Sequence, residues 1–294
     1  MSPIPPDWPM REHSQVLRCR PHEWHVQIIG AGPDLLLLHG AGASAHSFHR
    51  LARHLTGFRL IIPDLPGHGF TRAGGFRRLG LDAMADDLTT LGKDQGWRPV
   101  AIIGHSAGAA VALRMVEMAQ NPPDVIIGIN AALGPFDGFA GWLFPKLARA
   151  MSASPFVASI VTRLTSQRKQ VESLLRGTGS DLDADAVTLY QQLVSDPRHI
   201  EGTLGMMAQW ELKPLIERFP QTMLPVLLIG AANDKAVPVR VSRDAAARMQ
   251  RAVYQEVAGY GHLVHEEAPQ AVAALILPFL RKASVRISLV SNPV

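Results

Sequence analysis

Cysteine is almost absent from this chain, since Cys19 is the single cysteine among 294 residues. One thiol cannot form an intrachain disulfide, so the fold must depend on a hydrophobic core, and this composition suits a reducing compartment. The opening residues, MSPIPPDWPMREH, have no basic stretch followed by an apolar stretch, as a secretory signal would. These features lead us to expect a cytoplasmic protein.

Long apolar runs and basic clusters are also missing. No uncharged run reaches the roughly 18 residues that would span a bilayer, so no transmembrane segment is expected. The formal net charge is only +4, and the Lys and Arg residues are scattered without interleaved aromatics, which argues against a nucleic-acid partner. Hydrophobic residues make up 47% of the chain, the composition of a folded protein with a substantial core.

Signatures of bound metals and nucleotides are missing as well. The 12 histidines are dispersed, and none forms an H-x-x-x-H pair beside carboxylates, so we expect no metal site. The glycine-rich stretch HGAGAS (39–44) lacks the Gly-Lys-Ser/Thr ending of a phosphate-binding loop, and the chain has no dinucleotide fingerprint. No cofactor is therefore expected.

The chain does contain a series of short, uniformly apolar runs bounded by turn residues, at 34–40, 59–69, 99–106, 124–132 and 224–234. Such runs predict strands that are covered on both faces, as in a parallel sheet. Helical stretches alternate with them, at roughly 46–56, 81–96, 107–120, 239–251 and 267–282. The alternation predicts an α/β fold with an open, mostly parallel sheet flanked by helices. The early stretches SQVLRCR and EWHVQIIG alternate in polarity and predict an antiparallel hairpin at one edge.

One segment interrupts this alternation. Between about 133 and 209 the apolar patches follow helical spacing, and no buried strand is predicted. A helical insertion between two strands, at the carboxyl side of the sheet, is expected to act as a lid over a ligand. The predicted organisation is therefore a core from 1–132, a lid from 133–209 and a second part of the core from 210–294. The proline-rich first nine residues and the tail KASVRISLVSNPV are expected to be loose.

The pentapeptide Gly104-His105-Ser106-Ala107-Gly108 has the spacing G-x-S-x-G between an apolar strand and an Ala-rich helix. In that context the strand must turn into the helix in very little space, so residues two before and two after the turning residue must lack side chains. The hydroxyl of Ser106 would then project at the carboxyl edge of the sheet, where it could act as a nucleophile. The alternative is a strand-to-helix turn that contains a serine by chance.

A nucleophilic serine needs a base, and the base needs a group that orients it. In this architecture the acid and then the histidine follow the serine along the chain. Asp234 follows the apolar run at 224–234 and is the expected acid, although the adjacent Asn233 has a side chain of similar shape. The alternative role for Asp234 is to cap a loop. His262 follows Gly261 and precedes the last helix, whereas His265 is expected to lie one helical turn further on, at the surface or in packing.

The third requirement is a pair of N–H groups for the negative charge that develops on the attacked carbonyl oxygen. The HGAGAS loop follows a strand, and its Ala41 is the expected donor, with Gly42 as the alternative. Ala107, the residue after Ser106, is the expected second donor. His39 is expected to brace the loop.

The stretches HGAGAS, DLPGHG, GHSAG and GYGH, together with Asp234, resemble the α/β-hydrolase superfamily over nearly the whole chain. This resemblance implies the α/β-hydrolase fold, with a mostly parallel eight-stranded sheet. Five longer stretches are similar to one branch, the magnesium-chelatase accessory proteins of bacteriochlorophyll biosynthesis: PDWPMREHS, EWHVQ, NAALGPFDGFAGWLFPKLA, GTGSDLDADAVTLY and MMAQWELKPL. The resemblance implies a role in tetrapyrrole metabolism near magnesium insertion, with chelatase subunits as partners, but it does not define a reaction.

These inferences lead us to expect a serine hydrolase that cleaves an ester or other acyl bond of an apolar substrate, such as a tetrapyrrole. Alternatives are a general carboxylesterase or C–C bond hydrolase with the same residues, and a non-catalytic porphyrin carrier or chelatase chaperone. Apolar lid side chains would line a cavity for a flat ligand, although each could simply pack the lid onto the sheet. The candidates are Phe136, Phe139, Trp142, Phe144, Met207 and Trp210.

Overall fold

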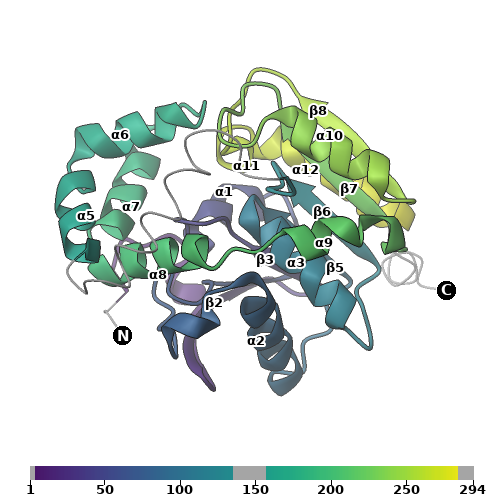
Figure 1. The fold of residues 1–294 in the computed structure, drawn as a ribbon, viewed down its shortest axis with the longest axis horizontal. Helices are drawn as coiled ribbons and strands as arrows, with labels where there is room; N and C mark the ends of the chain where they lie inside the picture. Colours follow the sequence, from purple (N-terminus) through teal and green to yellow (C-terminus); the bar gives the residue numbers. More distant parts are fainter. Residues whose placement is uncertain (1–3, 135–156, 284–294) are drawn as a thin grey trace.

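Eight strands form a single sheet in the computed structural model, which describes residues 4–134 and 157–283 (Figure 1). Across the sheet the strand order is β1-β2-β4-β3-β5-β6-β7-β8. The strand bounds are β1 Ser14–Cys19, β2 His22–Ile29, β3 Asp34–Leu38, β4 Arg59–Pro63, β5 Ala101–His105, β6 Val125–Ile129, β7 Val226–Ala231 and β8 Ala252–Val257.

The sheet is mostly parallel, as the sequence predicts. β4, β3, β5, β6, β7 and β8 run in one direction, with Leu36 opposite Ile102 and Ile102 opposite Ile126 in the central register. β1 and β2 form the expected antiparallel hairpin, with β1 at the edge of the sheet. The six parallel strands therefore end at one edge, which is where ligand sites form in open α/β sheets.

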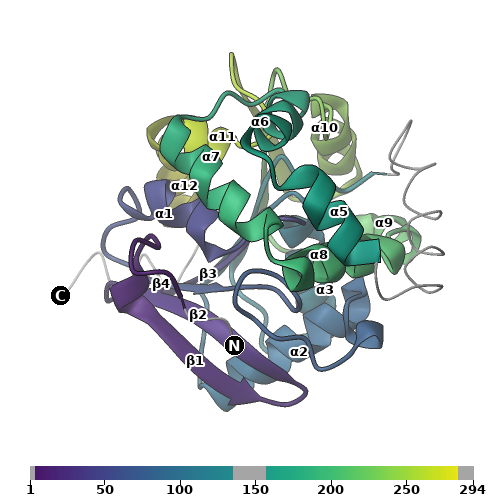
Figure 2. The ribbon, with the colours of Figure 1, turned by 90° about the vertical axis from the view of Figure 1, so that its left-hand side faces the viewer.

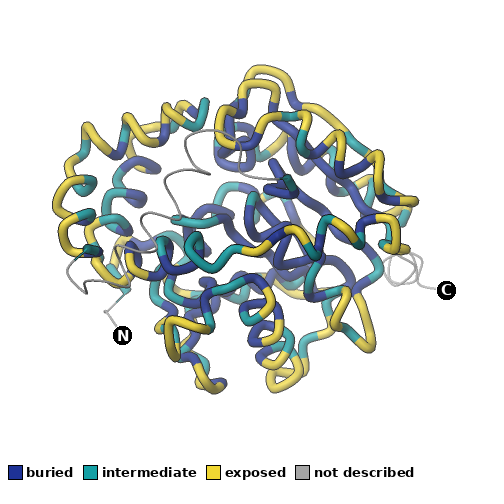
Figure 3. Tube along the Cα trace, viewed as in Figure 1, coloured by how far each residue is buried: buried dark blue, intermediate teal, exposed yellow. Residues whose placement is uncertain are grey.

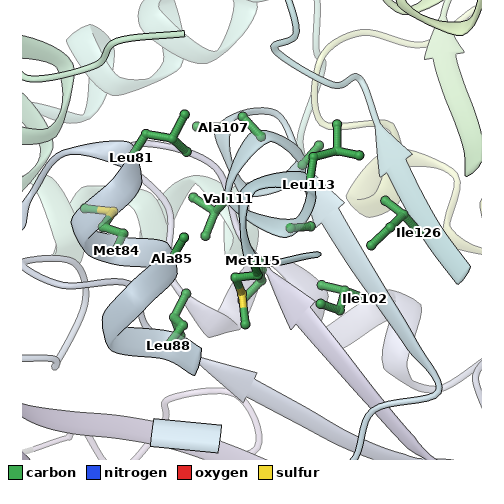
Figure 4. Close-up of a cluster of buried hydrophobic side chains, with 14 of the residues drawn as sticks. Leu81, Met84, Ala85, Leu88, Ile102, Ala107, Val111, Leu113, Met115 and Ile126 are labelled. Atoms are coloured by element: carbon green, nitrogen blue, oxygen red, sulfur yellow. The ribbon is translucent and has the colours of Figure 1, made fainter. Parts of the chain in front are cut away.

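Helices cover both faces of the sheet because the strand residues alternate between two apolar layers. Leu36 and Leu38 face a layer that includes α2 and α3, whereas Leu35 and Leu37 face a layer that includes α12. Figure 4 shows the first layer, where side chains of α2 and α3 meet those of β5 and β6. The bounds of the core helices are η1 Arg11–His13, η2 Ala45–Phe48, α1 His49–Ala52, η3 Phe76–Arg78, α2 Leu81–Asp94, α3 Ala107–Met118, α9 Lys213–Glu217, η4 Phe219–Gln221, α10 Val239–Arg248, α11 Val264–Glu267 and α12 Pro269–Ala283.

Among the described residues, four helices that precede α9 lie between β6 and β7 in the chain and pack beside the carboxyl edge of the sheet (Figures 1 and 2). They are α5 Val157–Thr165, α6 Arg168–Gly177, α7 Ala184–Val194 and α8 Pro197–Ala208. We call these helices and their connections the helical insert. Residues on its outer side are exposed, and residues on its inner side are buried or half-buried (Figure 3). Among the described residues no helix is long and apolar enough to cross a membrane.

The expectation that the first nine residues are loose is wrong for residues 4–9. Trp8 is only 3% exposed, and its ring contacts the rings of Phe70 and His46. The side-chain amide of Gln27 donates to the carbonyl of Pro9, which fixes the same segment. Burying the large apolar surface of an indole gives enough free energy to offset the entropy lost when a short segment becomes ordered. The proline-rich segment 4–9 therefore docks on the core. The tail beyond Ala283 lies outside the described residues.

The predicted helix at 46–56 is shorter than expected. A 3-10 turn over Ala45–Phe48 leads into the single turn of α1, which ends at Ala52. Phe48 and Leu51 are nonetheless fully buried, so this segment still covers its face of the sheet.

Candidate active site

Ser106 stands on the sharp turn between β5 and α3. Its backbone has φ 51° and ψ −118°, a combination that non-glycine residues rarely adopt. The turn is held by neighbouring chain: the amide of Ser106 donates to Ile129, and its carbonyl accepts from Ala109 and Ala132. Such strain persists only where the surrounding structure enforces it, and it is concentrated at functional sites.

The flanking glycines explain why this turn is sterically possible. A Cβ on Gly104 would collide with the backbone of Ala109, and a Cβ on Gly108 would collide with the carbonyl oxygen of Leu38. Helix α3 therefore approaches β3 and β5 more closely than any side chain would permit. The steric argument made from the G-x-S-x-G spacing agrees with these contacts.

Asp234 and His262 form a buried hydrogen-bonded pair at the same edge of the sheet. Asp234 follows β7 and His262 follows β8, and the His262 Nδ1 lies 2.8 Å from the Asp234 Oδ2. The other carboxylate oxygen, Oδ1, accepts 2.8 Å hydrogen bonds from the backbone N–H groups of Ala236 and Val237. Because an ionised carboxylate can only accept, Nδ1 is the donor in this hydrogen bond, and in the neutral form of the imidazole the lone pair is then on Nε2.

Two residues that the sequence analysis did not assign to the site fix the backbone of His262. The Asn130 side-chain amide donates to the His262 carbonyl at 2.8 Å, and the His105 Nε2 donates to the same oxygen at 2.9 Å. Burial lowers the pKa of His105 well below its usual value, so the ring is neutral. The sequence signal for Asn130 was a polar residue directly after the apolar run VIIGI, where parallel strands end.

His105 also links Ser106 to His262, because it precedes the serine and its ring centroid lies 4.7 Å from that of His262. The Ser106 hydroxyl makes no hydrogen bond to the imidazole in the part of the chain that the structure describes. Hydrogen bonds between a nucleophile and its base are often long before substrate binds. The structure thus gives an elbow serine and an oriented imidazole on adjacent loops.

The glycine-rich loop after β3 reaches Ser106 from the other side. A Cβ on Gly40 would lie 3.0 Å from the Cβ of Ser106, so this backbone passes directly beside the serine. Ala41 follows, partly buried against the core, and Gly42 adopts φ +77°. Ala107 begins α3, where first-turn N–H groups have no partner within the helix.

His39 and Asp64 brace this loop. The Leu65 amide donates to the His39 Nε2 at 2.9 Å, and the Ala45 amide donates to the Asp64 Oδ1 at 2.7 Å. Burial alone would raise the pKa of the Asp64 carboxyl, but the adjoining His25 imidazole and the N–H donors lower it to about 2. Neither residue is exposed to solvent, so both act on the shape of the loop.

His265 and Asn233 are the residues near His262 and Asp234 in the sequence that have similar side chains, but neither takes part in the hydrogen bond between His262 and Asp234. His265 is fully buried in α11, with its ring 4.3 Å from His105 and 5.2 Å from Phe48. The Asn233 backbone donates to Tyr260, and the carboxylate that meets an imidazole belongs to Asp234. His265 is therefore a packing residue, one of the two roles expected for it.

Of the predicted lid side chains, Phe136, Phe139, Trp142 and Phe144 lie outside the described residues. Met207 is half-buried at the end of α8. Trp210 is half-buried as well and packs against the core cluster that contains α2 and α3, which is a structural contact. Over residues 4–134 and 157–283, no group of three or more His, Cys, Asp or Glu side chains is arranged to hold a metal ion.

Comparison with known proteins agrees with this architecture. The family model for the alpha/beta hydrolase fold matches residues 33–269. The magnesium-chelatase 30 kDa subunit of Rhodobacter capsulatus is 44% identical to this chain over 280 residues, which cover 94% of the chain and 98% of that subunit.

More distant relatives carry hydrolase names. Lipase LipV of Mycobacterium tuberculosis is 29% identical, over 86% of this chain and 95% of the lipase. A crystal structure of an alpha/beta hydrolase fold protein from Burkholderia ambifaria superposes with a TM-score of 0.75 at 21% identity, covering 90% of this chain and all of that one.

Proposed function

The chain belongs to the α/β-hydrolase fold family, with the magnesium-chelatase 30 kDa subunit among its relatives, and on that premise we propose that it is a serine hydrolase. The observation that carries the proposal is the buried hydrogen bond between Asp234 and His262 beside the strained elbow of Ser106. In this proposal the three residues form a catalytic triad, and the segment 133–209 acts as a lid over it.

The proposed proton path follows from the tautomer of His262. Because its Nδ1–H donates to Asp234, its Nε2 accepts the proton from the Ser106 hydroxyl as the oxygen attacks a carbonyl carbon. The carboxylate of Asp234 stabilises the imidazolium that forms. His262 then returns the proton to the leaving group, and water releases the acyl group from Ser106 by the same route in reverse.

The negative oxygen of the tetrahedral intermediate needs N–H donors on the opposite side from the base. We assign this role to the backbone amides of Ala41 and Ala107, one on the loop beside Ser106 and one at the start of α3. A donor of this kind contributes roughly 100- to 1,000-fold to the rate.

The proposed substrate is an apolar molecule with an ester or similar acyl bond. Relatives named as a lipase and as pimeloyl-[acyl-carrier protein] methyl ester esterases support ester chemistry, and the 44% identity to a magnesium-chelatase subunit supports a tetrapyrrole in bacteriochlorophyll synthesis. A general carboxylesterase or a C–C bond hydrolase would use the same three residues.

A second candidate function is that of a tetrapyrrole carrier or chelatase chaperone that does not use its serine. The high identity to a protein named as a chelatase subunit favours it. In that case contact with the other chelatase subunits, rather than bond cleavage, would be the role in the pathway.

Labelling with a fluorophosphonate probe separates the two candidates. The hydrolase proposal expects covalent labelling of the wild-type protein and none in the variants Ser106→Ala and His262→Ala, because both nucleophile and base are required. A folded wild-type protein that takes up no probe would favour the carrier.

Absorbance titration with protoporphyrin, its magnesium complex and its methyl ester tests the proposed substrate class. Saturable binding of at least one of them is expected. No binding of any of the three would remove the tetrapyrrole from the proposal and leave a general esterase.

A further inference from the structure

The loop between α6 and α7 (residues 178–183) contacts both loops that carry the proposed acid and base. The carbonyl of Thr178 accepts a 3.0 Å hydrogen bond from the amide of Lys235, the residue after Asp234. The Ser180 hydroxyl accepts a 2.8 Å hydrogen bond from the amide of Leu263, the residue after His262. One short loop of the helical insert is therefore bonded next to each partner of the Asp234–His262 pair.

Glycines bring these three backbones into direct contact. Gly179 adopts φ +89°, and a Cβ on it would collide with the carbonyl oxygen of Asn233. A Cβ on Gly261, the residue before His262, would collide with the carbonyl group of Gly179. The α6–α7 loop therefore lies against the loops of both Asp234 and His262, with no side chain separating the backbones.

Glu267 makes a second connection between the same segments. Its Oε1 accepts from the amide of Asp181 at 3.0 Å, and its Oε2 accepts from the amide of Gly261 at 3.1 Å. One carboxylate thus bonds the helical insert on one side and the residue before His262 on the other. Together with Ser180, it fixes the amides on both sides of the histidine.

We propose that Ser180 is a positioning residue, through which the helical insert sets the orientation of the His262 imidazole toward Asp234. The inference deepens the proposed function, because it assigns the insert a part in proton transfer in addition to covering the site. Ser180 is 2% exposed, and the Leu263 amide beside it is bonded to its hydroxyl. Without that acceptor, a buried N–H loses its partner, and the segment that includes His262 must shift to find another.

The variant Ser180→Ala tests this role by steady-state kinetics with p-nitrophenyl butyrate. Because a small displacement of a base slows the chemical step, we expect kcat to fall by about 10- to 100-fold while KM changes by less than about 2-fold. Ser180→Thr, which keeps the hydroxyl, should recover most of kcat. Ser195→Ala is the matched control, because the Ser195 hydroxyl bonds only within α7 and touches neither loop. Unchanged kcat in Ser180→Ala would overturn the proposal.

A second readout does not require activity. The proton on His262 Nδ1, which is hydrogen-bonded to Asp234, should give a downfield NMR signal in the wild-type protein and in Ser195→Ala. The proposal expects this signal to shift or disappear in Ser180→Ala and in Glu267→Ala, with circular dichroism showing that both remain folded. An unchanged signal in both variants refutes the positioning role, whereas a wild-type protein that shows the signal but hydrolyses nothing refutes only the proposed function.

Discussion

The two carboxylate oxygens of Asp234 have different hydrogen-bond partners. Oδ1 accepts from two backbone amides, and Oδ2 accepts the hydrogen bond from His262 Nδ1, which the proposed proton transfer requires. Asp234→Asn keeps the shape of this side chain but can present an N–H to the imidazole, which favours the wrong tautomer. We expect kcat to fall by about 10,000-fold, measured with an activated ester.

The control for this prediction is Asn233→Ala, which alters the adjacent side chain and leaves the acid in place. A residual activity in Asp234→Asn within about 10-fold of the wild type would show that another group orients His262.

Glu266 is a fully buried carboxyl group, and its ionisation affects the stability of the fold. Burial raises its pKa to about 8, even though the Tyr190 hydroxyl donates to it at 2.6 Å. In the unfolded chain a glutamate ionises near 4.5, so between pH 4.5 and 8 the folded state holds a proton that the unfolded state has lost. The free energy of unfolding contributed by this group therefore falls as pH rises through that window.

Glu266→Gln removes this titration and keeps an acceptor for Tyr190. We expect the free energy of unfolding of this variant, minus that of the wild type, to increase from pH 5 to pH 8 in urea denaturation, because only the wild type loses stability through this group. A difference that stays constant across this range would mean that Glu266 is ionised in the folded protein.

Much of the candidate site could be predicted at this scale because each proposed catalytic residue follows a predicted strand. Ser106, Asp234 and His262 were predicted in this way, and the structure places the hydrogen-bonded Asp234–His262 pair near the elbow of Ser106, while their catalytic roles stay predictions. Asn130, His105 and Ser180 were not assigned to the site, because their roles depend on hydrogen bonds to the backbone of residues more than 80 positions away. The position of Asn130 after an apolar run was a signal, but a hydrogen bond to a distant backbone group does not by itself favour a residue type.

At the scale of elements, the elbow depends on how closely α3 approaches the strands. Gly108→Ala adds one methyl group where the backbone of Leu38 and His39 already makes contact. Neither backbone can move without displacing β3, so we expect a loss of about 3 kcal/mol in the free energy of unfolding. The measurement is urea denaturation, with Gly96→Ala, where the added Cβ meets no atom within 4 Å, as the steric control.

The control position also has a positive φ of 65°, so it reports the backbone strain of alanine without a collision. If both variants lost the same stability, close helix packing would not be the reason for the glycine at position 108.

Element positions were predicted well where burial on both faces makes a strand uniformly apolar, as in β3, β5, β6 and β7. The start of the chain was predicted poorly. Prolines near Trp8 suggested a loose segment, but the indole fills a site formed with Leu189 and Leu193 of α7. That site exists only after the insert has folded, so no local pattern could reveal it.

For the whole molecule, buried histidines make the free energy of unfolding depend on pH in the acid range. Nine of the 12 are buried, and burial lowers the pKa of His199 to about 4 and of His265 to about 3. Unfolded histidines take up protons near pH 6.5, where the rings of His199 and His265 remain neutral. The unfolded state then binds more protons, so stability is present above pH 6.5 and is lost progressively as pH falls toward 4 and 3.

We expect the free energy of unfolding to fall by about 2 kcal/mol for each such histidine between pH 7 and pH 5. Urea denaturation across this range measures the effect, and His265→Gln should reduce the slope by the contribution of one group. Equal stability at pH 7 and pH 5 would contradict the neutral state of these rings.

The strand order has a further consequence for biosynthesis of the protein. Ser106 lies in the first half of the chain, whereas Asp234 and His262 follow β7 and β8, which are the last two strands in the described part of the chain. A nascent chain that stops before residue 252 lacks the proposed base His262. It also leaves one side of β7, whose six residues are all buried in the finished sheet, without its neighbour. Premature termination should therefore yield products that lack the proposed activity and expose the unpaired edge of an apolar strand. Such an edge promotes aggregation, so we expect these products to be bound by chaperones or degraded by proteases.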